Sequence, residues 1–292
     1  MAQRVTTRLL ALLVLLCAVP ALEAQHSYRG FDRNVYPGDA ALPALRKSFS
    51  FTGYWLNNPP GTQRNTWTGK RALLKRYGFG FLVLFNGRTY AGLKAEQAKG
   101  TGAAALGAQD GKAAVAAAAR EGFAKNVRIF LDQEEGGRLL AEQAAYLFAW
   151  ADAVRKGGAR AGVYCSGIEV HDSSGAISTA QNIVERESAQ VKSSSKGKRP
   201  KGLALWIAND QCPPSPGCTL ASPPLAAAFS PALRASAVVW QYALSPRRAQ
   251  FSAACPRNQA PDGNCYAPGL PPSASTFVDL NTADSPDPSE AP

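Results

Sequence analysis

The feature that most constrains this chain is a series of eight short apolar or aromatic runs, separated by polar loops and helical stretches. Short runs rich in β-branched or aromatic residues are typical of parallel strands that are buried on both faces. Strands that alternate with helices predict a parallel sheet, and eight such units fit a closed (β/α)8 TIM barrel in the α/β class. The runs are residues 27–32, 51–56, 80–85, 127–132, 159–165, 202–208, 237–243 and 276–280.

Helical signals occupy most of the intervals between these runs. Residues 113–123 are Ala-rich, and residues 139–155 are amphipathic and are followed by a Gly-Gly C-cap signal. The last two intervals hold Pro-rich loops, so we expect the final helices to be short or missing. The alternative is an open doubly wound sheet, but no Gly-rich dinucleotide fingerprint follows the first run.

The termini differ in composition from the body of the chain. Residues 1–24 contain two arginines before an apolar stretch at 9–19, which predicts a cleaved signal peptide and a secreted or periplasmic protein. The stretch is short for a membrane span, so we expect no transmembrane segment after signal removal. Residues 25–281 are predicted to form the barrel, and the Pro- and acid-rich residues 282–292 a disordered tail.

The formal net charge is +11. An exported basic protein meets anionic cell-envelope polymers more readily than nucleic acid, so we expect a polysaccharide partner and no nucleic acid. The densest basic stretch, residues 192–201, is interpreted as a solvated loop, with polyanion binding as the alternative. We expect a monomer.

Four cysteines bracket two loops late in the chain. Export permits disulfides, and pairing of neighbours predicts Cys212–Cys218 and Cys255–Cys265, although four cysteines allow three connectivities. Cys165 lies in an apolar run and is predicted to be a buried free thiol.

Acidic residues gather where the predicted strands end. Asp32 ends the first run, Asp132 and Glu134 end the fourth, and Asp279 ends the eighth. In a TIM barrel, the chemistry belongs at the carboxyl ends of the strands. Residues two apart on an extended chain point to the same face, so Asp132 and Glu134 are expected to face the barrel mouth together. Glu135 is interpreted as a surface acid that caps the following helix.

This placement predicts acid/base chemistry. Crowded carboxyl groups raise one another's pKa, so that one stays protonated while another stays ionised, as glycoside hydrolysis requires. We predict Glu134 as the protonated general acid, favoured by the neighbouring charge of Asp132. Aromatic side chains near strand ends offer faces for sugar rings. The predicted substrate-binding set is Tyr54, Trp55, Trp206, Trp240, Gln241 and Tyr242.

Several short motifs resemble a known enzyme family. The motifs GFD (30–32), FLDQE (130–134), LWIA (205–208), WQY (240–242) and VDLN (278–281) resemble the Chalaropsis-type lysozymes, which are N-acetylmuramidases. More closely, GFDRNVYPGD (30–39) with GYWL (53–56) resembles an exported bacterial family described as glycoside-hydrolase-like. The resemblance covers about residues 28–281 and implies a TIM barrel.

The resemblance also implies roles for individual residues. Glu134 matches the general acid of the lysozymes, and Asp132, Asp32 and Asp279 match their other active-site carboxylates. The segments that line the saccharide are matched by Trp206, Trp240, Gln241 and Tyr242. One departure is the RN that follows GFD, where the lysozymes usually have a small hydroxyl residue. The loops after the sixth and seventh runs are also longer.

The leading hypothesis is a glycosidase acting on cell-wall or other exported polysaccharide, with peptidoglycan as one candidate. The alternative is a non-catalytic carbohydrate-binding barrel that retains the acidic cleft. A phosphodiesterase is disfavoured because the chain has only two histidines and no zinc motif, and we expect no metal or cofactor. A cysteine hydrolase built on Cys165 lacks a suitable histidine.

Overall fold

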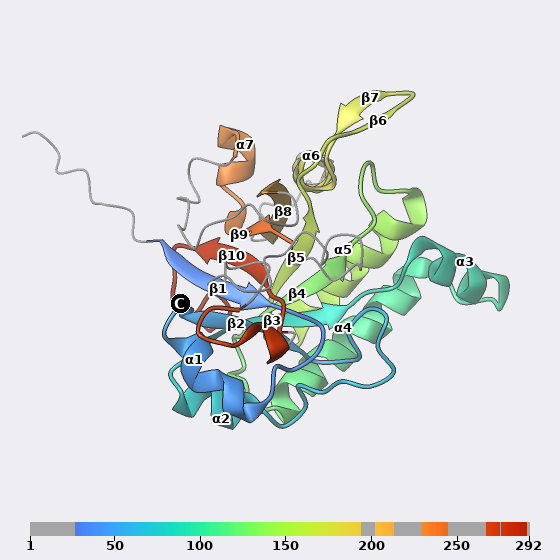
Figure 1. Cartoon of the computed structure of the whole chain (residues 1–292). Helices are drawn as coiled ribbons and strands as arrows, with labels where there is room; N and C mark the ends of the chain where they lie inside the picture. The colour runs from blue at the N-terminus through green and yellow to red at the C-terminus, as the bar shows by residue number, and fades with distance from the viewer. Residues whose placement is uncertain (1–26, 194–201, 213–228, 245–266, 275, 291–292) are drawn as a thin grey trace, which may run out of the picture.

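A closed barrel of eight strands forms the body of the protein (Figure 1). Around the barrel the order is β1-β10-β9-β8-β5-β4-β3-β2, which confirms the predicted TIM-like α/β barrel. The computed structural model describes residues 27–193, 202–212, 229–244, 267–274 and 276–290. The strands are β1 (Tyr28–Asp32), β2 (Phe51–Trp55), β3 (Gly80–Asn86), β4 (Arg128–Gln133), β5 (Arg160–Ser166), β8 (Ala204–Cys212), β9 (Ala237–Ala243) and β10 (Asp279–Ala283).

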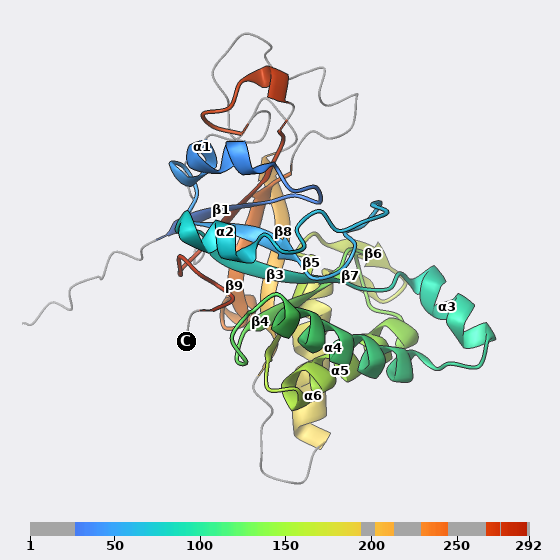
Figure 2. The ribbon, with the colours of Figure 1, turned by 90° about the horizontal axis from the view of Figure 1, so that it is seen from below.

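Helices surround the barrel unevenly. The longest, α4 and α5, pack along each other, and with α6 they lie on one side of the barrel, whereas α1 lies on the opposite side (Figure 2). The helices are α1 (Leu42–Arg46), α2 (Arg71–Arg76), α3 (Tyr90–Ala98), α4 (Ala103–Arg120), α5 (Ala141–Lys156), α6 (Thr179–Ser193) and α7 (Pro231–Arg234), with 3-10 turns at Asp39–Ala41 and Pro272–Ala274. As expected, the last helical elements in the described part of the chain are short.

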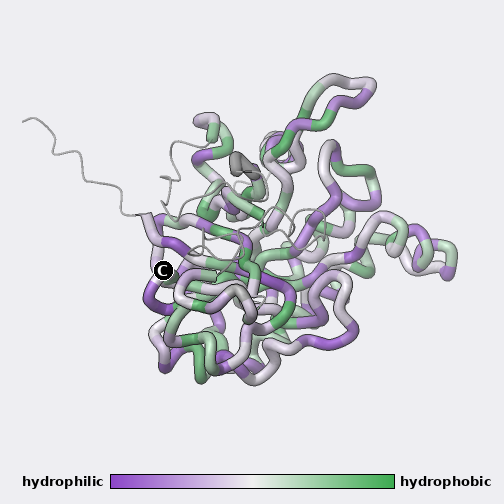
Figure 3. Tube along the Cα trace, viewed as in Figure 1, coloured by the Kyte–Doolittle hydropathy of each residue, from purple (hydrophilic) through white to green (hydrophobic). Residues whose placement is uncertain are grey.

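The ends of these elements follow local chemistry. Helix α5 ends where the sequence predicts, because Gly158 adopts a φ of 88°, a conformation that glycine adopts without steric cost. Strand β3 is buried along nearly its whole length, as its unbroken apolar run predicts. A small hairpin, β6 (Val170–Asp172) and β7 (Gly175–Ile177), projects from the body of the molecule after β5 (Figure 1) and carries both hydrophilic and hydrophobic segments (Figure 3).

The eighth strand differs from the prediction in position and direction. Strand β10 begins at Asp279 instead of ending there, and it runs antiparallel to both β1 and β9. Leu280 pairs with Ala243, so β9 ends and β10 begins at the same end of the barrel. An antiparallel neighbour needs no helical crossover, which agrees with the weak helical signal before it. Because the strand is reversed, its first residue still reaches the mouth, opposite Asp32.

The predicted disordered tail at 282–292 is wrong for the residues that the structure describes. Thr282 and Ala283 belong to β10, and residues 284–290 pack against the barrel. Pro- and acid-rich composition usually indicates disorder, because such a segment buries little apolar surface. Here the segment contributes hydrogen bonds instead, so composition alone misleads.

These hydrogen bonds complete one side of β3. Strand β4 pairs with β3 only from Val83 onward, and the C-terminal segment occupies the position before it. Ser289 is fully buried, its N–H donates to the Phe81 carbonyl (3.0 Å), and its Oγ accepts from the Val83 N–H (2.9 Å). The carboxylate of Asp287 accepts from the Phe81 N–H (3.1 Å). The tail therefore satisfies backbone groups that β4 leaves unpaired.

Replacing Ser289 with alanine should lower the free energy of unfolding by about 1–3 kcal/mol. The change leaves the buried Val83 N–H without its acceptor. Chemical denaturation measures the loss. Ser173, an exposed residue next to the projecting hairpin strands, supplies the control Ser173→Ala, which should have little effect. Equal stability of the two variants would contradict a structural role for the tail.

Candidate active site

The four predicted carboxylates gather at one end of the barrel. Asp32 ends β1 and pairs in register with Asp279, while Asp132 and Glu134 lie at the end of β4. The hydroxyl of Tyr164 on β5 interacts electrostatically with all four acids. Tyr164 therefore lies within electrostatic range of all four carboxylates.

Tyr164 was absent from the predicted site residues. Burial and the four negative groups hold the pKa of its phenol well above the ordinary value. It remains protonated and donates a hydrogen bond to Oε1 of Gln241 (2.7 Å). The only feature of the sequence that could have indicated a role for Tyr164 is its position near the carboxyl end of the predicted strand at 159–165. A single aromatic residue at such a position is usually part of the hydrophobic core.

Asp32 is buried and hydrogen-bonded. Its Oδ1 accepts from Nδ2 of Asn281 (2.7 Å) and from Nε2 of Gln241 (2.9 Å). The position opposite on β2 is Gly53, where a Cβ atom would lie 2.7 Å from the Cβ of Asp32. The glycine thus leaves the space that the Asp32 side chain occupies.

Asp132 has a different environment. It is 5% exposed, and neither carboxyl oxygen has a hydrogen-bond partner among the described residues. Burial, together with the charges of Glu134 and Asp32, raises its pKa well above the ordinary value. Asp132 is therefore the acid in this cluster that the structure favours in its protonated form.

This result changes the expected division of labour within the Asp132–Glu134 pair. The sequence predicted Glu134 as the protonated partner, but Glu134 is exposed, whereas Asp132 is buried. The prediction that the two carboxyl groups influence each other agrees with their electrostatic interaction. Because β4 ends at Gln133, Glu134 stands beyond the strand and reaches solvent.

A cavity of about 380 Å³ opens beside this pair. Asp132 and Glu134 line it, whereas Asp32 and Asp279 are not among its lining residues. The lining residues are Pro60, Gly61, Asn86, Gly87, Arg88, Thr89, Gly92, Asp132, Gln133, Glu134 and Glu135.

Glu135 connects the cavity wall to two helices. Its Oε2 accepts from the backbone N–H of Tyr90 at the start of α3 (2.8 Å) and from Nε2 of Gln143 on α5 (2.6 Å). The predicted capping role is thus correct in kind, but the helix whose first turn it caps is α3 and not the one that follows it. The two contacts hold the wall of the cavity in place.

The predicted aromatic lining is not present at the cavity. Tyr54 is fully buried, and its hydroxyl donates to Glu121, which is not one of the four clustered acids. Trp55 is also buried, and its Nε1 donates to the Arg33 carbonyl (3.1 Å). Position near a strand end did not show which face of the sheet each side chain occupies.

The segment around β9 shows the same separation. Gln241 points to the acids, so its neighbours Trp240 and Tyr242 point to the opposite face, where their rings pack together with centroids 5.8 Å apart. Trp206 is fully buried and donates from Nε1 to Oδ1 of Asn281 (2.9 Å). Among the described hydrogen bonds of the six predicted substrate-binding residues, that of Gln241 reaches one of the four clustered acids, Asp32. Trp206 is connected to Asp32 through Asn281.

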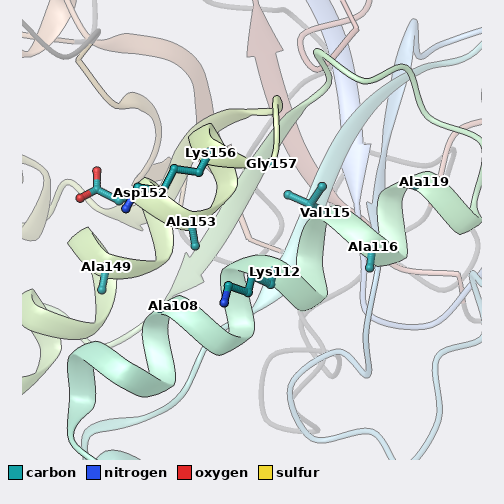
Figure 4. A pocket seen from close by; sticks show the side chains of 10 residues that line it. All are labelled: Ala108, Lys112, Val115, Ala116, Ala119, Ala149, Asp152, Ala153, Lys156 and Gly157. Carbon is teal, nitrogen blue, oxygen red and sulfur yellow. The ribbon is translucent and has the colours of Figure 1, made fainter.

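A larger hollow of about 700 Å³ lies elsewhere, between α4 and α5 (Figure 4). Its walls are mainly alanine, with charged groups from Lys112, Asp152 and Lys156. No histidine, cysteine or paired carboxylate faces it, so we place the chemistry at the smaller acidic cavity.

Other predicted features can be placed only in part. Cys165 is buried and free, as predicted, and burial raises the pKa of its thiol above the ordinary value. The predicted pairs Cys212–Cys218 and Cys255–Cys265 and the predicted signal peptide fall outside the described side chains. In the described part of the chain, no group of histidine, cysteine or acidic residues is arranged to hold a metal ion.

The fold and site define an α/β barrel with clustered carboxylates at its mouth. A model of the Rv2525c-like, glycoside hydrolase-like domain matches residues 50–213, and the chain belongs to this family. The resemblance to a glycoside-hydrolase-like family is thereby confirmed. A comparison with curated protein sequences finds no match.

Three solved structures are similar to this chain. An uncharacterized protein from B. stearothermophilus is 20% identical, with a TM-score of 0.54 over 88% of this chain and 95% of that one. The Tat-secreted protein Rv2525c of Mycobacterium tuberculosis, in complex with L-tartrate, is 16% identical, with a TM-score of 0.49 over 91% and 98%. A family 25 glycosyl hydrolase from Bacillus anthracis is 11% identical, with a TM-score of 0.42 over 88% of each chain.

Proposed function

We propose that this protein is a glycoside hydrolase that acts on cell-wall or another exported polysaccharide, with peptidoglycan as the first candidate. The observation that carries the proposal is the pair at the end of β4. Asp132 is buried without hydrogen-bond partners, and Glu134 stands exposed beside it in the same cavity. Two carboxyl groups in contrasting environments are the arrangement that acid/base cleavage of a glycosidic bond requires.

The pair is proposed to share one proton. In the empty cavity the proton resides on Asp132, because burial disfavours its ionised form. A saccharide that fills the cavity would remove water from Glu134 and so favour transfer of the shared proton to it. Glu134 would then donate this proton to the leaving glycosidic oxygen.

The remaining acids are proposed to act through charge. Asp32 and Asp279 face each other across β1 and β10 and place negative charge near the cationic sugar that develops as the bond breaks. For a substrate that carries a 2-acetamido group, attack on the sugar by that group is the alternative to attack by a carboxylate or water.

The alternative is a carbohydrate-binding barrel without catalysis. A binding protein has no need of a buried, unpartnered carboxyl, which is costly to retain. Incubation with peptidoglycan and a panel of polysaccharides, with release of reducing ends measured beside a pull-down, separates the two. Release of reducing ends supports the hydrolase, whereas binding without release from any substrate favours the binder.

We also propose that the protein is exported as a single barrel domain, with residues 1–24 removed. No helix in the described residues is long and apolar enough to cross a membrane. Peptide mapping of the mature protein without reduction should find an N-terminus near Gln25 and the crosslinks Cys212–Cys218 and Cys255–Cys265. Each short-loop disulfide should contribute about 2–3 kcal/mol. A retained leader contradicts export, and any crosslink to Cys165 contradicts the pairing.

A further inference from the structure

We propose that Asn281 and Gln241 are positioning residues that hold Asp32 as the ionised carboxylate of the mouth, while Asp132 is its neutral counterpart. This assignment rests on the proposed function of the same site, and it names the residues that set the charge of each acid. It assigns a role to a buried amide pair that forms no wall of the cavity.

The first step is the geometry at Asp32. One carboxyl oxygen receives two N–H donors, from Asn281 at 2.7 Å and from Gln241 at 2.9 Å. Both donors belong to buried side chains, so their bonds are little weakened by water. N–H groups that donate to a carboxylate stabilise its ionised form.

The second step is that neither amide is free to rotate. Tyr164 donates to Oε1 of Gln241 (2.7 Å), which turns Nε2 toward Asp32. The indole N–H of Trp206 donates to Oδ1 of Asn281 (2.9 Å), which turns Nδ2 toward Asp32. An indole N–H can only donate, so the orientation of Asn281 is fixed by its partner. The four side chains form one network whose donors converge on Asp32.

The third step is the absence of such donors at Asp132. Both of its oxygens are buried and have no hydrogen-bond partner in the described parts of the chain. The charges that act on it come from Glu134, just beyond the end of its strand, and from Asp32 across the mouth. A carboxyl in this position is more stable when neutral.

The two assignments are linked. Asp132, Asp32, Asp279 and Glu134 all act on the Tyr164 hydroxyl, so the cluster behaves as one interacting group. If Asp32 gains a proton more easily, one of the charges that keep Asp132 neutral disappears. Asp132 must then lose its proton at a lower pH. A residue that merely supports the fold would not produce these opposite shifts.

Carboxyl NMR of the mature, 13C-aspartate-labelled protein tests the inference without any substrate. Spectra of Asp32→Asn and Asp132→Asn assign the two resonances. In the wild type, Asp32 should titrate at a lower pH than Asp132. In Asn281→Ala, the midpoint of Asp32 should rise by about one pH unit, and the midpoint of Asp132 should fall.

Two gentler variants keep the test decisive if Asn281→Ala does not fold. Gln241→Met removes the second donor, and Trp206→Phe removes only the N–H that orients Asn281; both should shift the midpoints in the same directions. The matched control is Asn182→Ala. Asn182 is a buried amide that accepts hydrogen bonds from the Leu139 N–H and from Arg186, away from the acids, so its loss should leave both midpoints unchanged.

The outcome is independent of turnover. Unchanged midpoints in the folded Asn281 and Gln241 variants overturn the inference, even if the wild type hydrolyses polysaccharide. Opposite shifts of Asp32 and Asp132 support it, even if no polysaccharide is cleaved, in which case only the proposed function fails. A wild type in which Asp32 titrates above Asp132 also overturns it.

Discussion

Replacing Glu134 with glutamine should lower the turnover of a cleaved polysaccharide by about 10²–10⁴-fold, the range typical of general acid catalysis. Glutamine keeps the shape of the side chain in the cavity but cannot donate the carboxyl proton. Affinity for the saccharide should remain near that of the wild type, because the lost interaction develops only in the transition state. Hydrolysis rates and ligand affinity are measured on the same substrate.

The control for this prediction is Glu96→Gln. Glu96 lies on α3 in an exposed pair with Lys99, so the same chemical change there should leave turnover unchanged. A substrate with a good leaving group offers a second check, because it needs little protonation and should be cleaved by Glu134→Gln with a smaller loss. Unchanged turnover of the ordinary substrate in Glu134→Gln would end the general-acid assignment.

The sequence located the acids well because their position depends on strand ends alone. Asp32 and Asp132 close apolar runs whose length and composition predict strands, and a barrel brings such ends together. Asp279 reaches the mouth for a different reason, since its strand is reversed. Asp279 therefore lies at the predicted end of the barrel, but it is there because it begins a reversed strand and not because it ends a parallel one.

The aromatic residues predicted to bind substrate do not line the acidic cavity, because position along a strand does not fix the face that a side chain occupies. Alternation within WQY already places Gln241 on one face and its two aromatic neighbours on the other. What the sequence could not show is which face turns inward, because both faces of a barrel strand are buried. The roles of Tyr164 and Asn281 were likewise hidden, since each depends on partners from other strands.

The ordered tail is a further case in which composition was insufficient. This polar segment is held by hydrogen bonds to backbone N–H groups of β3 that β4 does not pair. The sequence of residues 284–290 does not indicate that such groups are available on β3. The sequence also gave no sign that Asp132 lies deeper than Glu134. That difference follows from where β4 ends, within the one- or two-residue uncertainty of any predicted boundary.

Replacing Asp132 with asparagine should stabilise the fold at neutral pH while it lowers turnover. Its pKa is raised in the folded protein above the ordinary value of 3.8. The contribution of Asp132 to stability is therefore most favourable below about pH 3.8, where this residue is protonated in both states. As pH rises from there to the folded-state pKa, the unfolded state releases a proton more readily, and stability falls by about 1.4 kcal/mol for each pH unit.

Asparagine carries no ionisable proton, so this loss disappears and the gap between variant and wild type should widen with rising pH. Chemical denaturation between pH 4 and pH 8 measures this difference in the free energy of unfolding.

Asp110→Asn is the control of opposite sign, because Asp110 pairs with Arg88 (2.6 Å) and accepts a hydrogen bond from Tyr146 (2.9 Å). Its loss should destabilise the protein. An Asp132→Asn protein no more stable than wild type at pH 7 would show that Asp132 is not held in a neutral, strained environment. Greater stability with lost turnover would mark a carboxyl that is retained for chemistry at the expense of the fold.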